Sequence, residues 1–78
     1  MNTSQRREMM LSALVAEAEG KIAIHKANVE IYLQNPAGIG EHSEIMHELK
    51  TQLNIIGKAN ERLEILEKFF DYPGNGSS

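Results

Sequence analysis

The chain has 78 residues, a mass of 8.7 kDa and no cysteine, which predicts a single small domain without disulfides or thiolate metal sites. Its net charge of -3 and mean hydropathy of -0.38 argue against a nucleic-acid partner, an anionic membrane surface and a transmembrane helix. Because so small a domain buries little surface by itself, we expect it to be stabilised by packing against another chain.

The N-terminal half carries a heptad pattern that predicts a helix from about Ser4 to Leu33. Arg6 and Arg7, followed by an apolar stretch, resemble a signal peptide, but Glu8 interrupts the charged region and the helical pattern continues past any cleavage point. We therefore expect a cytoplasmic protein. The predicted seam residues recur at alternating spacings of four and three: Leu11, Val15, Ala18, Ile22, His25, Val29 and Tyr32.

Pro36, Gly38 and Gly40 then predict a loop over residues 34–41. A second heptad helix is expected from His42 or Ser43 to about Phe70, followed by a flexible tail over residues 72–78, so that the domain covers residues 1–71. The seam residues of this second helix are Ile45, Leu49, Gln52, Ile56, Ala59, Leu63, Leu66 and Phe70, with Met46, Leu53 and Phe69 beside them.

These two segments predict an all-α fold, an antiparallel two-helix hairpin that resembles a coiled coil. In this hairpin, residues whose numbers sum to about 78 face each other, so that Val15 faces Leu63 and Ile22 faces Ile56. Further apolar residues flank the two seams: Met10, Leu14, Ile24, Ile31, Ile55, Ile65 and Phe69. One hairpin cannot cover stripes of this width, so we expect a homodimer that forms a four-helix bundle.

One polar layer interrupts the predicted seam, because His25 falls near Gln52. A buried polar layer of this kind can fix the register of a coiled coil, and a histidine there can titrate near neutral pH and open the bundle. A hydrogen-bonded core histidine without a switching role fits the same sequence, so the two interpretations stay open.

Glu44 and His47 form a Glu-x-x-His pair, which is the ligand pattern of carboxylate-bridged di-iron bundles. With Glu30 from the first helix, these residues are the candidate ligands of a metal-binding four-helix bundle, our alternative function. The pair also fits a solvated helix start, and nothing in the sequence requires a cofactor. Gly38 and Gly40 could belong to a phosphate-binding loop, but the lysine of such a loop is missing. The sequence also shows no set of nucleophile, histidine and acid that would form a catalytic triad, so we expect no enzyme.

The open end of the hairpin is the most suggestive feature for binding. Methionines beside aromatic residues make an adaptable surface for a protein partner, although they can equally cap the core or fill a dimer seam. The residues expected to gather there are Met9, Met10, Phe69, Phe70 and Tyr72.

The stretch from Ala27 to His42 contains Tyr32-Leu33-Gln34-Asn35-Pro36, then Gly38-Ile39-Gly40-Glu41-His42, ahead of the second heptad helix. This pattern resembles small helical-hairpin proteins of T4-like phages that infect marine cyanobacteria, over about two-thirds of the chain. The resemblance implies a phage accessory protein in the host cytoplasm or the virion. It lends no catalytic residue, because that family is uncharacterised. We therefore expect a non-enzymatic protein with a structural or protein-binding role.

Overall fold

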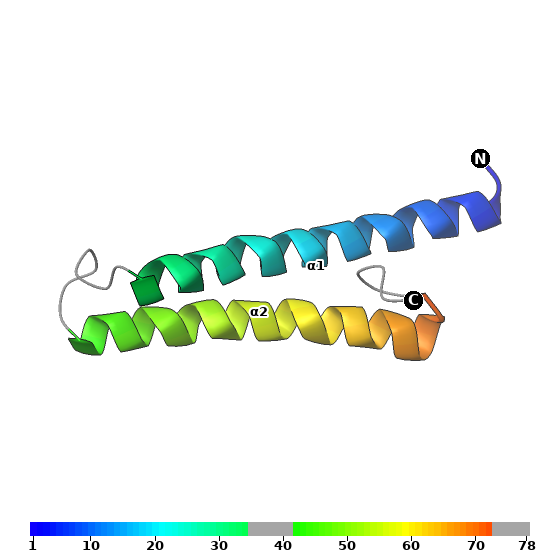
Figure 1. The fold of residues 1–78 in the computed structure, drawn as a ribbon. Coiled ribbons are helices and arrows are strands. Elements are labelled where there is room, and N and C mark those ends of the chain that lie inside the picture. The colour runs from blue at the N-terminus through cyan, green and yellow to red at the C-terminus, as the bar shows by residue number, and fades with distance from the viewer. Residues whose placement is uncertain (35–41, 73–78) are drawn as a thin grey trace.

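The computed structural model describes residues 1–34 and 42–72, apart from the side chain of His42. It contains two helices, α1 (Thr3–Gln34) and α2 (His42–Phe70), which lie side by side and run in opposite directions (Figure 1). The predicted all-α hairpin is confirmed, and the predicted helix ends agree within one residue. The predicted loop lies outside the described residues, except for Gln34, which ends α1.

The start of α1 is fixed by a reciprocal pair of hydrogen bonds. The backbone N–H of Gln5 donates to Asn2 Oδ1 at 2.8 Å, and the backbone N–H of Asn2 donates to Gln5 Oε1 at 3.0 Å. This is the geometry of a capping box, which satisfies two donors that a helix start otherwise leaves unpaired. The cap explains why α1 begins at Thr3, one residue earlier than the heptad pattern predicts.

The core lies between the helices and consists of seam residues from both. Its buried residues are Val15, Ala18, Ala59, Leu63 and Leu66, with Leu11, Ile22 and Tyr72 packed against them. The remaining seam residues are half-buried, except for buried Gln52 and for Phe70, which stays 48% exposed at the end of α2. Ala18 and Ala59 are the most completely buried side chains, and their small size allows the helices to approach closely there.

The contacts between the helices keep to the predicted register. His25 reaches Gln52, Arg62 reaches Glu17, and Arg7 Nη2 donates to the backbone carbonyl of Phe70 at 3.0 Å. The last bond ties the first turns of α1 to the end of α2 and satisfies a carbonyl that has no partner within the helix. The helices diverge towards this end, which carries the N-terminus (Figure 1).

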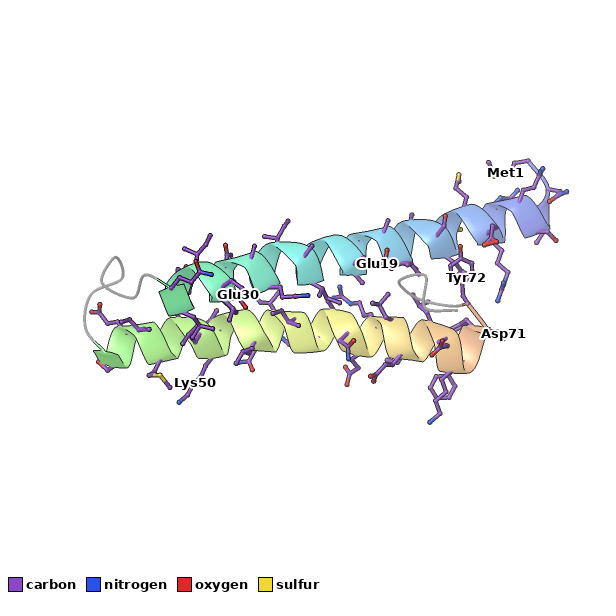
Figure 2. All side chains as sticks on the ribbon, viewed as in Figure 1. Met1, Glu19, Glu30, Lys50, Asp71 and Tyr72 are labelled. Atoms are coloured by element: carbon purple, nitrogen blue, oxygen red, sulfur yellow. The ribbon has the colours of Figure 1, made fainter. Side chains whose placement is uncertain are left out.

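The end of α2 turns the chain back onto the hairpin. Asp71 has a φ of 53°, the left-handed conformation that commonly ends helices and that aspartate tolerates better than most residues. The turn lets the Tyr72 N–H donate to the Leu66 carbonyl at 3.1 Å. Figure 2 shows Tyr72 directed back towards α1. Tyr72, the first residue of the predicted tail, thus packs against the core, and residues 73–78 lie outside the described part.

The hairpin is elongated and exposes more surface than a compact domain of its mass. Its principal extents are 54 × 20 × 19 Å, and its radius of gyration is 16.2 Å, whereas a compact chain of this length has about 11.5 Å. The accessible surface is 5831 Å², against roughly 4,700 Å² for a compact monomer. In the described ranges 1–34 and 42–72, α1 and α2 lack the continuous apolar stretch that a membrane-spanning helix needs.

Candidate interaction surface

One long side of the hairpin carries a row of exposed apolar residues, which we call the outer apolar face. Each member directly precedes a seam residue, so it is rotated by about 100° from the seam in the same sense on both helices. Because the helices are antiparallel, this rotation brings the rows from α1 and α2 to the same side of the hairpin. The face consists of Met10, Leu14, Ile24 and Ile31 from α1 and Ile55, Ile65 and Phe69 from α2.

An ion pair shows that the two rows lie together. Glu17 and Arg62 also directly precede seam residues, and the Glu17 carboxylate lies 3.7 Å from the Arg62 guanidinium across the helices. Both side chains are more than half exposed, so the pair itself adds little stability. Its value here is positional, because it fixes which residues of α1 and α2 face each other on this side.

The outer apolar face is open to solvent in the single chain. Six of its seven residues are exposed large hydrophobic side chains, from Ile65 at 41% to Phe69 at 66%, and Ile55 is half-buried. Near the N-terminal end, Met10, Ala13, Leu14 and Glu17 line a shallow hollow. Glu17, Lys21, Lys58 and Arg62 interrupt the row between its apolar groups. Exposed apolar groups of this kind typically mark contact surfaces.

The opposite side of the hairpin is more polar. The residues that directly follow seam positions include exposed Leu33, Met46 and Leu53, but also Glu19, Lys26, Asn60 and Glu67. Lys50 points away from α1 on the far side of α2 (Figure 2). The apolar surface is therefore concentrated on one side of the hairpin.

The predicted polar layer is present between the helices. His25 Nδ1 lies 2.6 Å from Gln52 Oε1, and Asn28 Nδ2 donates to the same oxygen at 3.0 Å. Since this oxygen only accepts, Nδ1 carries the proton in this arrangement. Gln52 is buried at 7% exposure, and its two partners are half-buried. The sequence pattern found His25 and Gln52, and the structure adds Asn28 as the third member.

The five residues expected to gather at the open end of the hairpin point in different directions and do not form a single cluster. Met10 and Phe69 belong to the outer apolar face, whereas Met9 is rotated by about 100° from Met10 on the same helix. Met9 and Phe70 are exposed, and Tyr72 packs against the core. The structure thus divides these five residues between the outer apolar face, the end of the hairpin and the core.

Tyr72 meets polar groups of α1 as well as the core. A hydrogen bond to the Glu8 carboxylate is the main cause that raises the pKa of Tyr72 above its ordinary value of 10.0. Burial and the negative charge of Glu8 act in the same direction, and the Ser12 hydroxyl acts weakly against them. The phenol therefore links the C-terminal turn to the first turns of α1, a contact that the heptad pattern did not indicate.

The candidate metal ligands are all on the surface. Glu44 and His47 line one shallow hollow near the start of α2, together with Ser43 and Glu48, and Glu30 is exposed on α1. Among the described residues, no three acidic, histidine or cysteine side chains are placed to hold a metal ion, so Glu30 does not join the other two in one chain. The possible phosphate-binding glycines, Gly38 and Gly40, lie outside the described residues.

The chain was compared with protein-family models, with curated proteins and with solved structures, and none of them matches it.

Proposed function

We propose that this chain is a non-enzymatic protein-binding hairpin, which dimerises through the outer apolar face to form a four-helix bundle. The observation that supports this proposal is the gathering of seven large apolar side chains on one side of the hairpin, against three on the opposite side. Burial of this row against another chain removes apolar surface from water, which is the main favourable term in protein association.

The amount of exposed surface is appropriate for a dimer. The chain exposes 5831 Å², which is roughly 1,100 Å² more than a compact monomer of its mass. Each partner in a stable complex of ordinary size buries about 800 Å². Burial of the outer apolar face against a second hairpin would remove part of this excess surface.

The end of the hairpin remains available for a different protein in such a dimer. Met9 and Phe70 are exposed there and are not part of the outer apolar face. A structural or accessory role in a phage-infected host or a virion is consistent with a small bundle that presents this end to a partner.

The oligomeric state tests the proposed function. Leu14 on the outer apolar face and Leu53 on the opposite side are matched leucines, 48% and 54% exposed. We expect a mass near twice 8.7 kDa for the wild type by sedimentation equilibrium at micromolar concentration. Leu14→Asp should shift the mass to that of the single chain, because it buries an unpaired carboxylate beside Glu17.

Leu53→Asp should remain dimeric, and circular dichroism should show helical content in both variants. A monomeric wild type, or equal loss of the dimer in both variants, would contradict the proposal.

A further inference from the structure

The outer apolar face has an internal order that restricts how a second copy can dock. The Glu17–Arg62 contact sets the facing pairs on this side. Seven residues after Glu17 and seven residues before Arg62 lie Ile24 and Ile55, which therefore face each other. Seven residues in the opposite direction lie Met10 and Phe69, which form another facing pair. Leu14, three residues before Glu17, faces Ile65, three residues after Arg62. Apolar residues therefore face apolar residues in three pairs.

We propose that the second copy docks with its two-fold axis parallel to the long axis of the hairpin, so that α1 lies over α2 of the second copy. This inference rests on the proposed function and adds the arrangement of the two chains. In each facing pair, the residue from α1 then contacts the α2 residue of the same pair in the second copy, and the residue from α2 contacts the α1 residue. Leu14 contacts Ile65 of the second copy, Ile24 contacts Ile55, and Met10 contacts Phe69.

Charge complementarity supports the same arrangement. Glu17 of each chain lies opposite Arg62 of the other, so the ion pair seen within one hairpin is repeated across the interface. The next pair consists of Lys21 and Lys58, whose like charges would face each other. Their long side chains can extend along the apolar surface and place the ammonium groups in water at the edge of the bundle.

The other two-fold arrangement matches fewer residues. If the axis were perpendicular to the hairpin, α1 would lie over α1 of the second copy. Alignment of Leu14 with Ile24 would then place Phe69 over Thr51 and Arg62 over Lys58. In that register Phe69, which is 66% exposed in the single chain, would lose its apolar partner. Alignment of Met10 with Ile24 would instead keep Phe69 over Ile55, but it would place Glu17 over Glu17 and Arg62 over Arg62. The parallel axis sets Phe69 against an apolar residue and Glu17 against Arg62 at the same time, whereas neighbouring helices are antiparallel in either arrangement.

Cysteine crosslinking distinguishes the two arrangements, because the chain has no cysteine of its own. Single-cysteine variants at Leu14, Ile65, Ile24 and Leu53 are mixed in pairs, refolded together and treated with a short bismaleimide. Facing helices in bundles lie about 8–10 Å apart, within reach of such a reagent. We expect Leu14→Cys with Ile65→Cys to give a covalent dimer of the two different variants, identified by its mass.

Leu53→Cys with Ile65→Cys is the control and should give little product. A dominant product from Leu14→Cys with Ile24→Cys would overturn the parallel axis and support the perpendicular one. A dimeric wild type without crosslinking in either pair would overturn the arrangement while the dimer itself remains. A monomeric wild type would instead contradict the proposed function.

Discussion

Neighbouring residues on α1 illustrate how differently the two apolar surfaces of this hairpin behave. Val15 is 9% exposed between the helices, whereas Leu14, one residue earlier, is 48% exposed on the outer apolar face. Both residues lie on rows of helix positions spaced alternately by three and four, but the outer row also contains the polar residues Glu17, Lys21 and Asn28. The difference arises because α2 covers only one of the rows. The same sequence pattern thus describes both a core within the chain and a surface that a second chain can cover.

Removal of seam volume should produce the largest effect on stability. Leu63 is 5% exposed and lies in the core, so Leu63→Ala should lower the free energy of unfolding by about 2–5 kcal/mol. Leu53→Ala, at a position that is 54% exposed, should cost less than about 1 kcal/mol. Urea unfolding at equal chain concentration measures both, since the stability of a dimer depends on concentration. Equal losses in the two variants would mean that the seam is not the main core.

The polar layer within the seam should contribute less. Gln52→Ala removes the oxygen that accepts from His25 and Asn28, and we expect a loss of about 1–3 kcal/mol in the free energy of unfolding. Asn54→Ala, on the exposed side of α2, is the control and should not destabilise the chain, because alanine favours helix more than asparagine does. If both variants are as stable as the wild type, the hydrogen bonds of Gln52 do not hold the helices together.

Much of this hairpin follows from the heptad pattern alone. The pattern predicts both helices, the register and the positions of His25 and Gln52, because burial between two antiparallel rods requires a residue of the seam at every third or fourth position. It also identifies the seven flanking apolar residues. Their gathering on one face needs the handedness of the helix and the antiparallel packing together, and the Glu17–Arg62 contact shows that this packing is present.

Other features depend on local chemistry that the pattern does not contain. The cap formed by Asn2 and Gln5 is a sequence signal, since an N-cap side chain followed three residues later by glutamine is typical of a capping box. The return of Tyr72 to α1 depends on the left-handed conformation of Asp71, which no periodicity indicates. The divided positions of Met9 and Met10 also show that residues adjacent in sequence on a helix face different directions.

The contact of Tyr72 with α1 should have the smallest effect, and it is best detected by titration. Because Glu8 raises the pKa of Tyr72, the tyrosine titrates at a higher pH in the folded chain than in the unfolded one. The resulting stabilisation is fully present below the unfolded pKa of about 10 and is lost as the pH rises through the folded value. The advantage of the wild type over Tyr72→Phe in urea unfolding should therefore decline above about pH 10.

Spectroscopic titration of the phenol assigns this effect to Glu8. The chain has two tyrosines, so Tyr32→Phe leaves Tyr72 as the only absorbing phenol. In that background, Glu8→Gln should bring the pKa of Tyr72 back towards 10.0, because the amide carries no charge and accepts a weaker hydrogen bond. An identical Tyr72 pKa with and without the Glu8 carboxylate would show that the C-terminal turn does not meet α1 in this way. The seam and the bond from Arg7 to the Phe70 carbonyl would then hold the two helices together at the open end of the hairpin.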